Sequence, residues 1–255
     1  MSAQRLAIGV DIGGTGIKVG LVDTVAGALV GERVRVLTPQ PAVPSSVIDA
    51  ARGLVGRFPA GLPVGVGIPG VIVDGRVLSA PHLDPEWIGF DAGEALVGAF
   101  GPTCTWLNDA DAAGIAETRV GAAVGHRGVV LLLTLGTGIG SALFVDGRLV
   151  PNTEFGHIEI RGKDGERRAS AAARKRKGLT YERWAPLLNE YLNRIDALVW
   201  PDLIVLGGGI SRQAERFVPL LDVRPPVVAA ALMNRAGIVG AAVHAAERAG
   251  RPAAA

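Results

Sequence analysis

The 255-residue chain is poor in cysteine and in aromatic residues, and each shortage excludes a class of structure. Cys104 is the single cysteine, so neither an intrachain disulfide nor a cysteine-rich zinc site can form. Aromatic residues make up 5% of the chain and hydrophobic residues 49%, so we expect a core of valine, leucine, isoleucine and alanine. The absence of disulfides suits a reducing compartment, and a cytoplasmic location is expected.

Long apolar runs that could cross a membrane are also scarce. Residues 128–145 carry no charge, but Gly136, Gly138 and Gly140 interrupt the run, and Asp146-Gly147 is typical of a hairpin turn. We therefore expect two buried strands there and no membrane contact. The first residues lead into a strand and do not resemble a secretory signal.

Basic charge is concentrated in one stretch. Residues 161–177 hold eight basic and two acidic residues, whereas 18 basic and 22 acidic residues remain elsewhere, a net charge of −4. A solvated charged helix is the commoner explanation of such a run, but a long anion lying in a groove also fits. Nucleic acid is not expected, because no aromatic residues alternate with the basic ones. The candidate groove residues are Arg161, Lys163, Arg167, Arg168, Arg174 and Lys175.

Two turns rich in glycine and threonine repeat each other along the chain. The first is Gly13-Gly14-Thr15-Gly16, with Asp11 before it and Lys18 after it, and the second is Gly136-Thr137-Gly138, preceded by Thr134. Such turns between strands expose N–H groups and hydroxyls that suit phosphate oxygens. One copy alone would be most simply a hairpin, but two copies favour a phosphate chain held in a cleft between two lobes.

Neither turn matches the commoner nucleotide-binding motifs. A dinucleotide fingerprint needs a helix directly after its glycines, whereas residues 19–23 are typical of a strand. A P-loop needs Gly-Lys-Ser/Thr, and the one Gly-Lys pair, Gly162-Lys163, is followed by Asp164.

The predicted elements follow the same order in both halves: three strands, then alternating helix and strand. This order predicts a mixed parallel and antiparallel α/β sheet that is repeated twice. Strands are expected at 5–11, 17–23, 31–37, 64–68, 103–107, 129–135, 139–145, 148–150 and 202–206, and helices at 45–57, from 108 onward, 164–176, 180–198 and 236–249. On a helix over 164–176, two basic pairs, Arg167-Arg168 and Arg174-Lys175, would share one face. We divide the chain into lobes at 1–108 and 109–240, with 241–255 as the helix end and tail.

Acidic side chains stand at two strand ends. Asn108-Asp109 could cap the following helix, or Asp109 could accept the proton of a substrate hydroxyl during phosphoryl transfer, and both can hold at once. Asp11 could simply help to form the turn. If the turn binds phosphate, however, the Asp11 carboxylate would repel it unless a cation lies between them, and Mg²⁺ bound through water would be such a cation. Further on, Glu154 and His157 could hold vicinal hydroxyls, and a metal site there would need more ligands than the region offers.

Together these motifs resemble the ROK sugar kinases, a branch of the actin-like ATPase (ribonuclease H-like) superfamily, and within it the polyphosphate-using glucokinases of actinobacteria. The resemblance covers nearly the whole chain and includes Thr38-Pro39-Gln40-Pro41, Trp87-Ile88-Gly89 and Ala236-Gly237-Ile238-Val239-Gly240. It implies duplicated α/β domains with an interdomain cleft, a homodimer, and transfer of the terminal phosphoryl group of polyphosphate, with ATP as a further candidate donor, to the 6-hydroxyl of glucose.

The resemblance also implies roles for individual residues. Asp109 would be the base, and Asn108, Glu154, His157 and Gly70 would form the sugar site. Phosphates and Mg²⁺ would be held by Asp11, Gly13, Gly14, Thr15, Gly16, Lys18, Thr134, Gly136, Thr137 and Gly138, while Gly207, Gly208 and Gly209 match the adenosine-side turn.

Two departures from the wider family matter. The basic segment replaces a Cys-rich zinc motif, so no zinc is expected, and the sugar-binding Glu that ends that motif has only Glu159 as a weak counterpart. His82 stands where close relatives have Asn, which leaves the preference among hexoses open.

Three other functions are compatible with parts of the sequence. A glucokinase of the same fold that uses only ATP is the nearest alternative, although the basic segment argues against it. A sugar-responsive repressor would carry a helix-turn-helix segment before the first strand, which we do not expect here. A catalytically inactive polyphosphate- or sugar-binding regulator is disfavoured by the presence of both Asp109 and Asp11.

Overall fold

The computed structural model describes residues 5–250, which divide into two compact units. The first unit contains the residues up to Ala116 and those from Arg235 onward, and the second runs from Glu117 to Asn234. Our division at 108 and 240 placed these boundaries differently. The first unit takes in most of helix α3 (Asp109–Val120) and the whole of helix α7 (Ala236–Ala249).

The first unit is built on a mixed sheet with the strand order β3-β2-β1-β5-β8, and β4 also pairs with β2. β1 and β2 are antiparallel, whereas β1, β5 and β8 are parallel. The carboxyl ends of these three parallel strands therefore share one edge, where a ligand of such a sheet is expected to bind. The strands are β1 (Leu6–Gly13), β2 (Gly16–Asp23), β3 (Ala28–Leu29), β4 (Val34–Val36), β5 (Val64–Ile68) and β8 (Thr105–Asn108).

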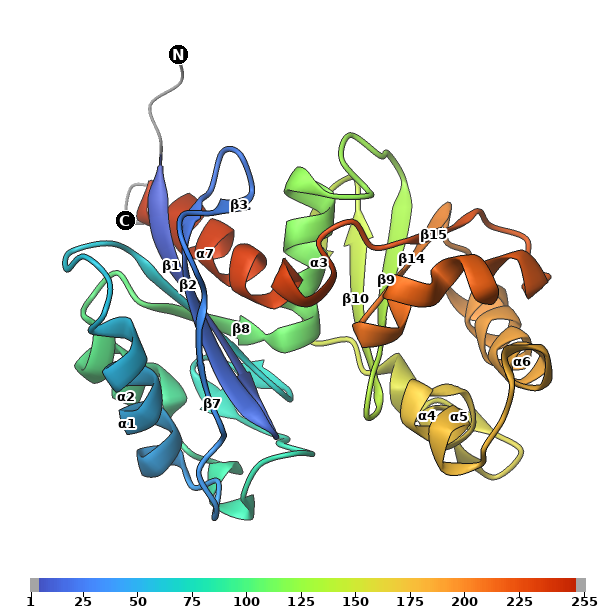
Figure 1. Cartoon of the computed structure of the whole chain (residues 1–255), viewed down its shortest axis with the longest axis horizontal. Helices are drawn as coiled ribbons and strands as arrows, with labels where there is room; N and C mark the ends of the chain where they lie inside the picture. Colours follow the sequence, from blue (N-terminus) through green and yellow to red (C-terminus); the bar gives the residue numbers. More distant parts are fainter. Residues whose placement is uncertain (1–4, 251–255) are drawn as a thin grey trace. The chain divides into compact units, whose positions relative to one another are not determined.

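Helices cover both faces of this sheet (Figure 1). Helices α1 (Pro44–Val55) and α2 (Ala92–Phe100) lie on one face, and α7 lies on the other. The α7 backbone comes so close that a Cβ atom on Gly65 would lie 1.8 Å from the carbonyl oxygen of Ala241. Glycine in the strand thus lets the C-terminal helix pack directly on the sheet. A small hairpin, β6 (Ile72–Val73) and β7 (Arg76–Val77), and a 3-10 turn, η1 (Pro85–Trp87), complete the unit.

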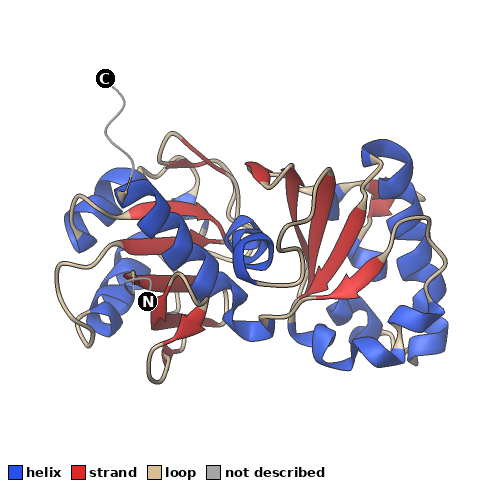
Figure 2. Cartoon of the chain, turned by 90° about the horizontal axis from the view of Figure 1, so that it is seen from above, coloured by secondary structure: helices blue, strands red, loops and turns tan. Residues whose placement is uncertain are grey.

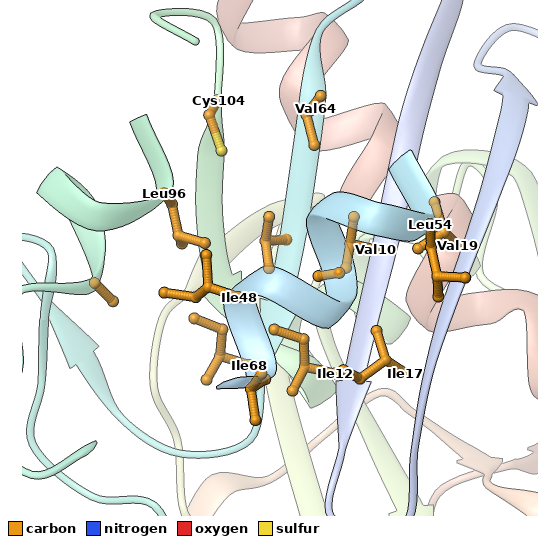
Figure 3. Packing of buried hydrophobic residues seen from close by; sticks show 14 of the residues in the cluster. Val10, Ile12, Ile17, Val19, Ile48, Leu54, Val64, Ile68, Leu96 and Cys104 are labelled. Carbon is orange, nitrogen blue, oxygen red and sulfur yellow. The ribbon is translucent and has the colours of Figure 1, made fainter. Parts of the chain in front are cut away.

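The core between this sheet and helices α1 and α2 is aliphatic (Figure 3). Val10 and Ile12 alternate along β1 and are fully buried, and Ile48 of α1 and Leu96 of α2 pack in the same cluster. Burying one such side chain contributes roughly 1.5–3 kcal/mol. Cys104 lies in this cluster, and burial raises the pKa of its thiol to about 12. The thiol is therefore uncharged near neutral pH and has a packing role.

The second unit repeats the arrangement with the strand order β11-β10-β9-β14-β15. β11, β10 and β9 are antiparallel, and β9, β14 and β15 are parallel. The predicted pair of mixed sheets is thus confirmed (Figure 2). The strands are β9 (Val129–Leu135), β10 (Ile139–Val145), β11 (Arg148–Val150), β14 (Leu203–Gly207) and β15 (Val227–Ala229). The prediction missed the short β15 as well as α2 and the β6–β7 hairpin.

The prediction of one helix over 164–176 is wrong. The chain forms two short helices, α4 (Glu166–Ala169) and α5 (Ala171–Arg176), because Ser170 is extended (φ −66°, ψ 159°). The Ser170 hydroxyl accepts a hydrogen bond from the N–H of Ala173 and so caps α5. The two basic pairs predicted to share a face therefore belong to different helices.

The remaining elements of the second unit complete the chain. A small hairpin of β12 (Glu159–Ile160) and β13 (Lys163–Asp164) precedes α4, and the long helix α6 (Tyr181–Val199) follows α5. Within residues 5–250, no helix has both the length and the apolar character that a membrane crossing requires. The 3-10 helices are η2 (Phe155–His157), η3 (Gly209–Arg216), η4 (Val218–Leu220) and η5 (Met233–Arg235).

Candidate active site

The first glycine turn is a two-residue hairpin between β1 and β2. Gly13 pairs with Gly16 across the ladder, so Gly14 and Thr15 form the tip. The Thr38 hydroxyl donates a hydrogen bond to the carbonyl oxygen of Gly13 at 2.5 Å, which fastens the turn to the segment after β4. The tip thus projects from the end of β1 on an anchored base.

Asp11 and Lys18 form an ion pair beside this turn. They lie opposite each other on β1 and β2, and the Lys18 Nζ is 2.7 Å from the Asp11 Oδ2. The first turn of α7 lies against the same carboxylate, since a Cβ atom on Gly237 would be 3.0 Å from its Cγ. A helix N-terminus favours a negative charge. Because Lys18 occupies one oxygen and the Asp11 side chain is only 16% exposed, the carboxylate fits Mg²⁺ held through water rather than bound directly.

Asn108 caps helix α3, and Asp109 is the first residue of that helix. The Asn108 Oδ1 accepts hydrogen bonds from the N–H groups of Ala110 (2.7 Å) and Asp111 (3.1 Å), and its Nδ2 donates to the carbonyl oxygen of Gly70 (3.0 Å). The capping interpretation is thus confirmed for Asn108, which is buried. The same bonds fix the backbone at Asp109, whose side chain is half-buried.

Strand register brings Asp11 and Asp109 to one edge of the first sheet. Asp11 is paired with Gly67 of β5, and a Cβ atom on Gly67 would lie 3.6 Å from the Asp109 Cα. Gly70 follows just beyond this edge with φ +119°, and a side chain there would overlap the carbonyl oxygen of Ser79. The ion pair of the first turn and the candidate base thus flank a single glycine.

His82 also lies against the first turn. A Cβ atom on Gly14 would be 2.8 Å from the His82 carbonyl oxygen and 3.0 Å from its Cβ. The side chain of His82 is exposed. The residue that departs from the family pattern therefore neighbours the predicted phosphate turn.

The second glycine turn has a carboxylate beside it. The Ile139 N–H donates to the Glu166 Oε2 (3.1 Å), and a Cβ atom on Gly138 would lie 2.2 Å from the same oxygen. Within the turn, the Gly136 N–H donates to the carbonyl oxygen of Gly138 at 3.0 Å. The Gly136 carbonyl oxygen accepts from the N–H of Ala172 in α5, also at 3.0 Å, which ties the turn to that helix. Glu166 thus places a negative charge next to residues predicted to hold phosphate.

The triple glycine, Gly207 to Gly209, lies next to this second turn. Gly207 ends β14, where it pairs with Thr134 of β9, and Gly209 begins η3. The triple glycine and the second glycine turn therefore occupy the same edge of the second sheet, as their positions at strand ends predicted.

Glu166 also belongs to a cluster around His157, the last residue of η2. The His157 Nε2 is 4.0 Å from the Glu154 Oε2, and its Nδ1 is 3.4 Å from the Asp164 Oδ2. Burial and the nearby charge of Glu166 raise the pKa of Glu154, and His157 partly offsets this. An imidazole between carboxylates offers donors and acceptors in the pattern that vicinal hydroxyls require.

Sequence reasoning missed Glu166 and Asp164 in this cluster. Ligand atoms of His157, Asp164 and Glu166 lie within 4.8 Å of one another, so the region offers more potential ligands than Glu154 and His157 alone, and the expectation that no metal site forms here stays a prediction. The weak candidate Glu159 is instead an exposed residue of β12. The pattern that could have pointed to Glu166 is its place as the first residue of a short helix, but the prediction of one long helix hid it.

Hydrogen bonding divides the basic segment into two groups. Arg161 and Arg168 both pair with Glu190 of α6, and Arg174 donates to the carbonyl oxygen of Leu179 and lies over the Tyr181 ring. The two arginines lower the pKa of Glu190. Among the six predicted groove residues, the side chains that are exposed and form no hydrogen bond or ion pair within residues 5–250 are Lys163, Arg167 and Lys175.

Comparison with known proteins identifies the family. The ROK family model matches residues 7–178. A polyphosphate glucokinase of Mycobacterium tuberculosis is 49% identical over 95% of this chain and 92% of its own length. An inorganic polyphosphate/ATP-glucomannokinase of an Arthrobacter strain is 49% identical, with a TM-score of 0.91 over 96% of this chain and 99% of its own.

A ROK glucokinase of Streptomyces griseus, solved with glucose and AMPPNP, is 27% identical, with a TM-score of 0.78 over 93% of this chain and 98% of its own. These structural neighbours have the duplicated actin-like ATPase fold that the sequence predicted. The chain belongs to the ROK family.

Proposed function

We propose that this protein transfers the terminal phosphoryl group of inorganic polyphosphate, and also of ATP, to the 6-hydroxyl of glucose. The observation that carries the proposal is the edge of the first sheet, where the Asp11–Lys18 pair and Asp109 flank Gly67. Phosphoryl transfer needs charge neutralisation at the phosphate and a carboxylate at the attacking oxygen. The names of relatives that are 49% identical support both substrates.

In the first unit, Asp109 accepts the proton of the 6-hydroxyl as its oxygen attacks the terminal phosphorus, and the bond from that phosphorus to the rest of the donor breaks. The exposed tip of the first turn and Lys18 hold the phosphate oxygens. Mg²⁺ bound through water at Asp11 would neutralise charge on these oxygens. Asn108 keeps Asp109 in position through its cap on α3.

In the second unit, the cluster around His157 holds the sugar hydroxyls. Glu154 and Glu166 accept hydrogen bonds from hydroxyls, and His157 donates one. Glu166 joins the predicted sugar site because its carboxylate lies in this cluster and is held in place by the Ile139 N–H. Glu159 is left out of the site, since it is exposed on β12.

Polyphosphate as a donor is supported by the cations of the basic segment whose side chains form no hydrogen bond or ion pair with the described part of the chain, residues 5–250. Lys163, Arg167 and Lys175 are exposed, so they can bind an extended polyanion without first breaking an ion pair. Dependence on Mg²⁺, a cytoplasmic location and a homodimer belong to the same proposal through the family resemblance.

The test is formation of glucose 6-phosphate with Mg²⁺, with polyphosphate and ATP compared at matched concentrations of terminal phosphate. We expect product with both donors and faster reaction with polyphosphate. Product from ATP alone would favour the ATP-only glucokinase and leave the basic segment as a solvated surface. Binding of polyphosphate or glucose without product from either donor would favour the inactive regulator. The Asp109→Asn variant is the control for background phosphorylation.

A further inference from the structure

Arg35 lies on the short strand β4, beside the first glycine turn. In the β2–β4 ladder Arg35 is paired with Lys18, and in the β1–β2 ladder Lys18 is paired with Asp11. Paired residues of adjacent strands point to the same face of a sheet. Asp11, Lys18 and Arg35 therefore form a row across three strands.

The Arg35 guanidinium packs against the turn itself. A Cβ atom on Gly16 would lie 2.8 Å from the Nε and 2.9 Å from the Nη2 of Arg35. Gly16 closes the turn whose tip is Gly14 and Thr15. The absence of a side chain at position 16 thus makes room for a guanidinium next to the N–H groups predicted to bind phosphate.

The charges of this row do not balance. Lys18 is neutralised by Asp11 at 2.7 Å, whereas Arg35 is exposed and its side chain forms no hydrogen bond or ion pair within residues 5–250. Arg35 therefore leaves the row with a net positive charge beside the turn. A bound anion would balance this charge, and the planar fork of a guanidinium matches the geometry of phosphate oxygens.

We propose that Arg35 binds the phosphate group of the donor at the first glycine turn, together with Lys18. The inference rests on the proposed function and adds a residue to its donor site. Because the contact is with a phosphate group common to both donors, Arg35 acts on ATP and polyphosphate alike. This distinguishes it from the basic segment, which we expect to act on polyphosphate alone. The simpler alternative is that Arg35 binds no ligand and only prevents the edge strand β4 from pairing with a strand of another molecule.

The test compares Arg35→Gln and Arg35→Lys with Arg52→Gln, a control that removes an exposed arginine from helix α1. Binding of ATP with Mg²⁺ and of inorganic tripolyphosphate is measured by calorimetry, without glucose, alongside the donor KM at saturating glucose. We expect Arg35→Gln to weaken both ligands and raise both donor KM values about tenfold, and Arg35→Lys to restore part of the loss. Arg52→Gln should leave all values unchanged, and melting temperatures should agree within 2 °C or so.

The outcomes separate the inference from the proposed function. If the wild-type protein binds neither phosphate compound, the proposed function fails. If it binds them and Arg35→Gln binds them equally well, Arg35 is only an edge charge and the inference alone is overturned. An equal loss in Arg35→Gln and Arg52→Gln would point to net charge and would also overturn it, as would a loss with tripolyphosphate but not with ATP.

Discussion

The two glycine hairpins share a sequence pattern and a place in their sheets, yet the charged side chains in direct contact with the two turns have opposite sign. The first has Lys18 and Arg35 beside it, and its acid, Asp11, is neutralised by Lys18. The second has the Glu166 carboxylate, which accepts from the Ile139 N–H. A duplicated fold thus preserves the backbone turn while the neighbouring side chains determine which ligand group each copy suits.

This contrast assigns different chemistry to the two units. Cations and exposed turn amides suit phosphate, so we expect the first unit to bind the transferred phosphate group and to supply the proton acceptor. Carboxylates around an imidazole suit neutral hydroxyls, so we expect Glu166, which lies beside the second turn, to bind the sugar. Substitutions in each copy can therefore separate donor effects from sugar effects.

The largest effect is expected at the candidate base of the first unit. Asp109→Asn should lower kcat by about 10²–10⁴-fold, because the proton of the attacking hydroxyl loses its acceptor. Glucose binding, measured by calorimetry, should change little. Asp49→Asn, which removes an exposed carboxylate from helix α1, is the matched control. Near-normal turnover in Asp109→Asn would remove Asp109 from the chemistry.

A smaller effect is expected at the carboxylate of the second turn. Glu166→Gln should raise the glucose KM about 10–100-fold, since hydrogen bonds to charged groups contribute about 1.5–3 kcal/mol. Donor KM values should stay close to wild type. Glu159→Gln is the control, because this nearby carboxylate is exposed. A rise in donor KM with unchanged glucose KM would assign Glu166 to the donor site. It would contradict the division of donor and sugar binding between the two turns.

The two glycines of the second turn allow a test within one hairpin. Gly138→Ala would press a methyl group against Glu166, whereas a Cβ atom on Gly136 has no neighbour within 4 Å. We expect Gly138→Ala to lower the free energy of unfolding by about 1–3 kcal/mol and to raise the glucose KM, and Gly136→Ala to do neither. In a Glu166→Ala background the clashing carboxylate is gone, so Gly138→Ala should lower the free energy of unfolding by less than it does in the wild type. A double-mutant cycle measures this difference. An unchanged cost would mean that the clash lies elsewhere.

The uncommitted cations of the basic segment are expected to distinguish the two donors. Replacing Lys163, Arg167 and Lys175 together by Gln should raise the polyphosphate KM about tenfold and leave the ATP KM nearly unchanged, and the difference should shrink at high salt. The single variant Arg174→Gln is the control, because that guanidinium is bonded to the Leu179 carbonyl oxygen and stacked on Tyr181. An equal rise for both donors would contradict a role specific to polyphosphate.

The smallest effect concerns stability and pH. Burial raises the folded-state pKa of Glu154, so its stabilising contribution is present at low pH and is lost as pH rises through that pKa. Glu154→Gln should therefore gain stability relative to wild type between acidic and neutral pH, by less than about 1 kcal/mol because the site is only half-buried.

Glu182→Gln is the control of opposite sign for this pH dependence. Hydrogen bonds from its own N–H and from the Thr180 hydroxyl lower the pKa of Glu182. This variant should lose relative stability as pH rises, measured by urea unfolding across the same pH range. The same trend in both variants would show that the site around Glu154 is not responsible.

Local patterns were enough to predict most of the elements. The strands β5, β9, β10 and β11 and the helix α7 match their predicted ranges, because clear apolar runs end at Gly, Pro or Asp residues. The break between α4 and α5 was missed because alanines on both sides of Ser170 favour helix, whereas the serine instead caps α5.

The candidate site could be predicted only where its residues are close in sequence. Asp11 and Lys18 stand on one hairpin, and Asn108 and Asp109 are adjacent, so their proximity follows from the motif. The contact between Glu166 and the second turn joins residues 27 positions apart, and the Arg35 contact depends on a strand pairing. Such contacts arise from tertiary packing, for which no local pattern exists.

The close packing of α7 on β1 and β5 has a consequence for the order of events during synthesis. The helix that covers the first strand, and whose first turn lies against Asp11, is made only after the residues of the second unit. The whole second unit is translated in between and can fold as it emerges. One face of the first sheet therefore stays without its covering helix until the second unit has been made, so the Asp11 site cannot be completed before the second unit is synthesised.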